Sequence, residues 1–229
     1  MQLTESNRQF TPAFSWLEID TVLLDLDGTL LDKYFDDFFW EEFVPEVFAG
    51  KNRISIPAAK KNLLYTYKKV EGTLKWTDLD YWSDELYLDI PMLKKEISHL
   101  IALRPHVIEF LEYLKKKKKK IYLVTNAHPK TLDLKLGKID IAKHFTAIFC
   151  AKEVGTAKEQ PEFWSMLREL IPFNRTRTLF ADDTEKVLYS ARNYGLRHLI
   201  HIAQPSSQRP ATFSRDFTSI LNFQELMAS

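Results

Sequence analysis

Two carboxylates stand two positions apart in an apolar part of the chain. Asp25 interrupts the apolar run of residues 21–26, and Asp27 follows it. A buried charge is costly, so a carboxylate at such a place points to chemistry. An Asp carboxylate can attack phosphorus, and a second acid on the same side of an extended strand can protonate the leaving oxygen and then activate water. Asp27-Gly28 is also a common turn signal, which is the structural alternative.

Further polar residues follow other apolar runs in the same way. Thr125 and Asn126 end the run of residues 121–125, Lys158 lies a few positions beyond 146–150, and Asp182 and Asp183 end 178–181. Mg²⁺ prefers oxygen ligands, and carboxylates gathered without a cation would repel one another. A hydroxyl and an ammonium would bind phosphate oxygens. The set therefore indicates a site for a phosphate and a hard cation. Asp183 has an alternative use as the N-cap of the next helix.

The elements that must bring these residues together are short strands. The runs at 21–26, 121–125, 146–150, 178–181 and 198–202 are apolar on both faces, as in buried parallel sheets. Helical patterns at 107–116, 162–170 and 185–194 alternate with them. We therefore predict an α/β fold with helices on both faces of a parallel sheet, whose strands present ligands at their carboxyl ends.

A second pattern occupies residues 34–102. It contains no strand-like run and predicts four helices at 34–48, 58–70, 79–88 and 92–102, with Pro57 and Pro91 at or near two of the starts. We predict a core domain of residues 1–33 and 103–229 with an all-helical domain of residues 34–102 inserted in it. Many aromatic residues lie in this insert, and most of them are expected to fill its small interior.

Composition narrows the functional classes. The 229 residues carry 32 Lys and Arg against 31 Asp and Glu, a net charge of +1 that argues against a nucleic-acid binder, with the run Lys115 to Lys120 as the one contrary feature. The single cysteine, Cys150, excludes a disulfide within the chain and disfavours a cysteine zinc site. No segment has the length of a membrane span, and residues 1–14 lack the pattern of a signal peptide, so we expect no membrane partner and a cytoplasmic protein.

The motifs Asp25-Leu26-Asp27-Gly28-Thr29, Thr125-Asn126, Lys158 and Asp182-Asp183, in this order, resemble those of the haloacid dehalogenase-like hydrolase superfamily. The resemblance implies a Rossmann-like core with a helical cap and Mg²⁺ as cofactor. It makes Asp25 the nucleophile and a metal ligand, and Asp27 the general acid and base with its backbone carbonyl on the metal. Asp182 and Asp183 would complete the metal site. Thr125, Asn126 and Lys158 would bind the phosphoryl group.

Two positions depart from the pattern of that superfamily. Glu159 and Gln160 separate Lys158 from Pro161, although a proline often follows the lysine directly, so Lys152 is a second candidate. Ala181 stands where glycine often precedes the last motif, which leaves the division of roles between Asp182 and Asp183 open.

Residues 35–40, 44–46, 79–83 and 125–129 are also similar to bacterial purine nucleotidases of this superfamily that hydrolyse GMP and IMP. This similarity implies a purine nucleoside monophosphate as substrate. Residues that could contact it are His128, Trp40, Trp76, Tyr81 and Trp82. Three alternatives stay open: a phosphatase or mutase acting on another small phosphate ester such as phosphoglycolate or a sugar phosphate, a silent phosphate-binding regulator, and a nucleic-acid-binding module suggested by the lysine run.

Overall fold

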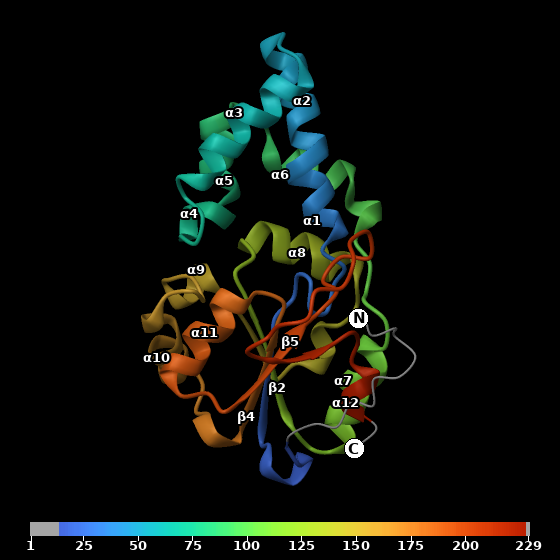
Figure 1. Ribbon diagram of the computed structural model, residues 1–229, viewed down its shortest axis with the longest axis vertical. Helices are drawn as coiled ribbons and strands as arrows, with labels where there is room; N and C mark the ends of the chain where they lie inside the picture. The colour runs from blue at the N-terminus through green and yellow to red at the C-terminus, as the bar shows by residue number, and fades with distance from the viewer. Residues whose placement is uncertain (1–13, 228–229) are drawn as a thin grey trace.

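The computed structural model describes residues 14–227 (Figure 1). Residues 1–13 and 228–229 lie outside this description. They include most of the segment 1–14, which the sequence predicts not to be a signal peptide, and the first and last residues of the predicted core domain. None of the helices between residues 14 and 227 combines the length and the hydrophobicity that a membrane span requires.

A parallel sheet of six strands forms the base of the molecule, in the order β3-β2-β1-β4-β5-β6. The strands are β1 (Thr21–Leu24), β2 (Lys120–Thr125), β3 (Ala147–Cys150), β4 (Thr178–Asp182), β5 (His198–Ile202) and β6 (Thr218–Ile220). The α/β prediction is confirmed, and five predicted strands are present. β1 ends at Leu24, two residues earlier than predicted, and the short edge strand β6 was not predicted.

Helices cover both faces of this sheet because successive strand residues point to opposite sides. Val22 and Leu24 belong to a core with α7 (Val107–Lys116) and α12 (Gln224–Met227). Leu23 belongs to a second core with α10 (Pro161–Leu170) and α11 (Glu185–Tyr194). The short helix α9 (Ala151–Val154) also contributes to this second core. Figure 1 shows α10 and α11 on one side of the sheet and α7 and α12 on the other.

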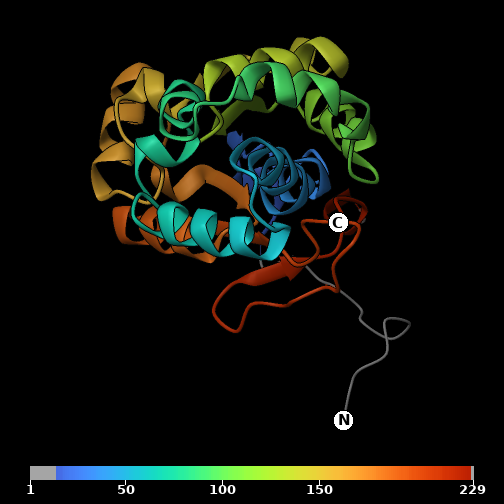
Figure 2. The same cartoon turned by 90° about the horizontal axis from the view of Figure 1, so that it is seen from above.

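The segment between β1 and α7 is helical and stands above the carboxyl ends of the strands (Figures 1 and 2). It contains α1 (Tyr34–Phe38), a π-helical stretch η3 (Phe39–Phe43), α2 (Val44–Asn52), α3 (Ile56–Lys68), α4 (Leu74–Thr77), α5 (Leu79–Leu86), α6 (Ile90–Glu96) and η4 (Ser98–Leu100). We call residues 34–102 the cap. The four helices predicted there are present, but the last one ends at Glu96, and α4 is an addition. The division into two domains at these residues stays a prediction.

Aromatic side chains fill the interior of the cap. Trp82 is fully buried, and its ring centroid lies 5.1 Å from that of Tyr67 and 5.7 Å from that of Trp40. Its indole nitrogen donates to the backbone oxygen of Trp76 at 2.8 Å. Large rings in edge-to-face contact provide a core that a small helical unit could not build from aliphatic residues alone.

One helix between the sheet and the cap was not predicted. α8 (Pro129–Lys138) follows β2 and packs against α6 and η4. Three further turns, η2 (Trp16–Glu18), η5 (Ala142–His144) and η6 (Arg175–Arg177), connect elements of the core. α8 carries a buried lysine, Lys135, that lies in the site described below.

The lysine run lies at the end of β2 opposite to Thr125. Lys115 and Lys116 end α7, Lys118 has a positive φ of 56°, and Lys120 begins β2. Most of these side chains are exposed. Lys119 is the exception, because its ammonium donates to the backbone oxygens of Trp16 and Ile19 at 2.6 Å each. The predicted solvated turn on the far side of the core is confirmed.

Candidate active site

The predicted chemical residues meet at the carboxyl ends of the central strands. Asp25 follows β1, Thr125 ends β2 and Asp182 ends β4. In the sheet, β2 and β3 lie on one side of β1, and β4 lies on the other side. Open α/β sheets bind ligands where the strand order reverses in this way. A cavity of about 450 Å³ lies there, and residues of both the core and the cap line it.

Backbone contacts fix the loop that carries the first two carboxylates. The amide nitrogen of Asp25 donates to the oxygen of Ala181 at 3.1 Å, which holds the end of β1 against β4. Gly28 then turns the chain with a φ of +83° and donates to the oxygen of Leu31 at 2.8 Å. A β-carbon at Gly28 would lie 2.7 Å from Oδ2 of Asp183, so glycine is required by both the turn and its close neighbour.

Lys158 lies between two carboxylates at the bottom of the cavity. Its ammonium is 2.5 Å from Oδ1 of Asp25 and 2.7 Å from Oδ2 of Asp182, and all three residues are buried. The side chain of Asn126 holds the lysine's loop, because its Oδ1 accepts from the amide nitrogen of Lys158 at 3.0 Å. The structure thus brings together the residues predicted for the nucleophile, the metal and the phosphate.

Burial controls the protonation of this group. Desolvation raises the pKa of Asp25 well above its usual value, against the opposing charge of Lys158. Desolvation likewise raises the pKa of Asp182 to about 6, again opposed by Lys158. Burial acts against the charge of Lys158, but the carboxylates of Asp182 and Asp25 outweigh it and raise the pKa of that ammonium. Both acids therefore hold their protons more strongly than a free aspartate does. A further positive charge nearby would stabilise their ionised forms.

Three carboxylates form a set that fits a divalent cation. Oxygens of Asp25, Asp182 and Asp183 all lie within 4.8 Å of one another. Lys33 also reaches this set, with its ammonium 2.5 Å from Oδ2 of Asp183. A donor set made only of oxygens has the chemistry that hard cations require. The N-cap of α11 is Thr184, so Asp183 does not have the capping role that was its alternative.

Asp27 lies apart from this set. Its Oδ1 accepts from the ammonium of Lys135 at 2.6 Å, and the same ammonium is 2.5 Å from Oδ2 of Asp36 in the cap. Lys94 of α6 completes the group at 2.7 Å from Oδ1 of Asp36. Desolvation raises the pKa of Asp27, which Lys135 opposes. A contact between the backbone carbonyl of Asp27 and a metal stays a prediction.

The remaining phosphate candidates line the same cavity. Thr125 is buried, and its hydroxyl accepts from the amide nitrogen of Ala127 at 3.0 Å, which tightens the turn after β2. The amide group of Asn126 donates to Oε2 of Glu159 at 2.9 Å. Lys152, the second candidate for the phosphate lysine, is exposed and does not line the cavity. The geometry favours Lys158.

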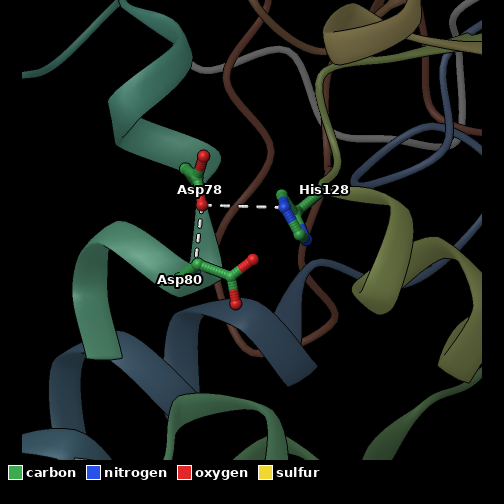
Figure 3. Close-up of side chains that lie close together, drawn as sticks. All are labelled: Asp78, Asp80 and His128. Carbon is green, nitrogen blue, oxygen red and sulfur yellow. Dashed lines mark hydrogen bonds and ion pairs between the residues drawn. The ribbon is translucent and has the colours of Figure 1, made fainter. Parts of the chain in front are cut away.

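His128 lies where the core meets the cap (Figure 3). Its Nε2 is 3.6 Å from Oδ1 of Asp78 and 3.2 Å from the ammonium of Lys152, and burial lowers its pKa. Asp78, Asp80 and His128 lie close enough together to suggest a cation site. However, Asp78 caps α5 and Asp80 pairs with Lys130, so these carboxylates already have partners. We read the group as a contact between cap and core.

The aromatic candidates divide into two kinds. Trp40 and Trp76 line the cavity together with His128. Tyr81 and Trp82 do not line it, and Trp82 is fully buried in the interior of the cap. Substrate contacts for all five predicted residues stay predictions, and the cavity gives most support to Trp40, Trp76 and His128.

The sequence did not indicate several charged residues that lie in or beside the site, and four of them pair with one another or with predicted site residues. These four are Lys33, Asp36, Lys94 and Lys135. Each looks like a solvated charge in the sequence, and its partner lies far along the chain; Lys135 and Asp27 are 108 positions apart. A weak signal was present for Asp36 and Asp37, which lie close after Asp27 in a stretch of large aromatic residues.

Comparison with known proteins agrees with this geometry. The family model for haloacid dehalogenase-like hydrolases matches residues 19–195. The chain is 39% identical over 193 residues to the GMP/IMP nucleotidase YrfG of Escherichia coli, a match that covers 84% of this chain and 87% of that protein. It is 19% identical to a phosphorylated carbohydrates phosphatase of Thermotoga maritima, over 91% of this chain and 97% of that one.

Among solved structures, a phosphatase of the same superfamily from Thermococcus onnurineus has a similar fold. The TM-score is 0.76 at 21% identity, and the match covers 92% of this chain and 97% of that chain. The likeness supports the arrangement of sheet and helices described above.

Proposed function

We propose that this chain, which belongs to the haloacid dehalogenase-like hydrolases, is a Mg²⁺-dependent 5′-nucleotidase that acts on purine nucleoside monophosphates. The similarity to a GMP/IMP nucleotidase over most of both chains supports the substrate class. The cytoplasmic location predicted from the sequence is part of the same proposal. The observation that carries the proposed chemistry is the buried contact of Lys158 with Asp25 and Asp182 beneath a cavity shared by core and cap.

Two displacements at phosphorus follow from this arrangement. In the first, a carboxylate oxygen of Asp25 bonds to phosphorus, and the ribose oxygen leaves with a proton from Asp27. In the second, water attacks the phosphoryl group and gives a proton to Asp27, which releases phosphate and restores Asp25. Lys158 and the loop of Thr125 and Asn126 hold the phosphoryl oxygens.

Asp25, Asp182 and Asp183 would hold Mg²⁺, which supplies positive charge that neutralises the phosphate and the carboxylates. The cap would close the cavity over the nucleotide and exclude bulk water. Phosphate release should therefore stop after thorough chelation and return when Mg²⁺ is added back. Activity that survives chelation would remove the metal from the proposal.

Replacing the nucleophile tests the reaction. Asp25→Asn keeps the size of the side chain but cannot form the phosphoryl-enzyme, so release of phosphate from GMP and IMP should fall to background. Asp133→Asn is the matched control, because Asp133 is exposed on α8 and does not line the cavity. Turnover retained by Asp25→Asn would refute the nucleophile assignment.

A phosphate-release screen tests the substrate. We expect GMP and IMP to have the highest kcat/KM among nucleoside monophosphates, phosphoglycolate and sugar phosphates. Higher values for sugar phosphates would instead favour the activity named for the Thermotoga relative. Absence of turnover with every ester would favour a silent phosphate-binding protein.

A further inference from the structure

A chain of alternating charges leads from Asp27 into the cap. Lys135 of α8 contacts Asp27 at 2.6 Å and Asp36 of α1 at 2.5 Å. Lys94 of α6 contacts the other oxygen of Asp36 at 2.7 Å. Two ammonium groups and two carboxylates, from the loop after β1 and from the helices α1, α6 and α8, therefore form one connected group, which we call the Lys135 network.

Both lysines are almost completely shielded from water. Lys135 is 1% exposed and Lys94 is 2% exposed. The ammonium of Lys135 also lies 5.2 Å from the ring centroid of Phe35, and that of Lys94 lies 4.5 Å from the ring centroid of Phe39. Burial of an ammonium has a large desolvation cost that is offset only by close, well-directed partners. The position of Lys135 is consequently fixed within narrow limits by its two carboxylates.

We propose that Lys135 is a positioning residue for Asp27. Because Lys135 also contacts Asp36, the orientation of the Asp27 carboxylate depends on the position of the cap. The inference rests on the proposed function. Lys135 contacts Oδ1 of Asp27, which leaves Oδ2 as the oxygen for the leaving group and for water. Asp27 would act as acid in the first step and as base in the second, so its carboxylate must keep the same orientation toward phosphorus in both. The contact with Lys135 provides that constraint.

The charge balance of the network supports positioning over simple neutralisation. Asp36 takes half of the contacts of Lys135, and its own second oxygen is paired with Lys94. Lys135 therefore shares its positive charge between one carboxylate of the core and one of the cap. Because Asp36 and Lys94 both belong to the cap, a displaced cap would remove these contacts and release Lys135 from its position.

The experiment compares esters with poor and good leaving groups. Release of a ribose oxygen needs a proton from Asp27, whereas 4-nitrophenolate leaves without one. Rapid-mixing measurements would follow the first turnover of GMP and of 4-nitrophenyl phosphate by wild type, Lys135→Met and Lys138→Met. Lys138 is the matched control, since it is an exposed lysine one turn along α8 and does not line the cavity.

For Lys135→Met we expect the first-turnover rate at saturating GMP to fall by about 10- to 100-fold, with little change in the GMP concentration that gives half of this rate, because a general acid contributes about 10²-fold or more. The first turnover of 4-nitrophenyl phosphate should change less than about threefold, since that step makes no use of the acid. Lys138→Met should match wild type on both esters. A merely structural role predicts equal losses on both esters, and that result, or no loss on either, would overturn the proposal.

Lys135→Met leaves two partly buried carboxylates close to each other without the ammonium between them. If this variant does not fold, the double variant Lys135→Met with Asp36→Asn removes that repulsion and is compared with Asp36→Asn alone by the same ratio of rates. Wild-type protein that hydrolyses neither ester would overturn the proposed function together with this inference. Wild-type turnover with an unchanged ratio in the variants would overturn this inference alone.

Discussion

The charge of Asp182, which we propose as a metal ligand, depends on pH because its side chain is buried. Desolvation raises its pKa to about 6, so the carboxylate is charged above this pH and protonated below it. A proton competes with a metal for the same oxygens, so proposed Mg²⁺ binding should weaken as the pH falls. Between pH 7 and pH 5 the charged fraction drops about tenfold, and the Mg²⁺ affinity measured by calorimetry should drop by roughly the same factor. Asp182→Asn, which has no charge to lose, should show a smaller dependence; equal dependence in both proteins would contradict the assignment.

Gly28 gives a second prediction at this scale. A β-carbon there would meet Oδ2 of Asp183 at 2.7 Å and the β-carbon of Pro205 at 2.9 Å, in a backbone conformation that L-residues rarely adopt. Gly28→Ala should lower the free energy of unfolding by about 1–3 kcal/mol and displace Asp183 from the carboxylate set. Gly50→Ala in α2 is the control, because nothing lies within 4 Å of its added carbon. It should be neutral or stabilising by up to about 1 kcal/mol. Urea unfolding measures both, and a Gly28 variant as stable as wild type would argue against the close approach.

At the scale of elements, Asp78 has two separable roles at the start of α5. Its Oδ1 accepts from the amide nitrogens of Asp80 and Tyr81 at 2.9 and 3.2 Å, and the side chain also faces His128 and Lys152 of the core. Asp78→Ala removes both roles and should cost about 1 kcal/mol in the free energy of unfolding from the lost cap. Asp78→Asn keeps the capping oxygen, so it should recover most of this loss; the remainder, at most about 1 kcal/mol, measures the contact with the core. Equal losses in both variants would show that capping is not the source.

Elements were predictable where their own pattern carried the signal. The strands β1, β2 and β4 are continuous apolar runs because both faces of the sheet are covered. α8 gave no such signal, since its leucines Leu132, Leu134 and Leu136 alternate with a strand-like period while two of its buried positions hold Thr131 and Lys135. The helix forms there because the cap and the sheet surround it, which is tertiary information that local periodicity does not contain.

In the whole molecule, the site residues that were predicted are those marked by a local sequence pattern. The site residues that were missed depend on contacts between distant parts of the chain. Asp25, Thr125 and Asp182 were found because each ends or directly follows a buried strand, and parallel strands present their carboxyl ends at one edge of the sheet. Lys94 and Lys135 became visible only once the cap was placed over the sheet, because their carboxylate partner Asp36 comes from a distant part of the chain. The cavity likewise exists only between cap and core.

The distribution of charge over the molecule gives the last prediction. The lysine run lies at the start of β2, and the site lies at the other end of this strand. The strand has six residues and spans about 20 Å at ~3.3 Å per residue, which separates the lysines from the site. At physiological salt the Debye length is about 8 Å, so these lysines should neither contact nor attract the anionic substrate. Lys116→Gln with Lys118→Gln should leave kcat/KM for GMP within about twofold of wild type, since surface changes away from a site rarely reach it. Lys68→Gln is the contrasting variant, because this exposed lysine lines the cavity and its loss should raise KM. A fall in kcat/KM for the double variant as large as that for Lys68→Gln would mean that the run acts on the substrate after all.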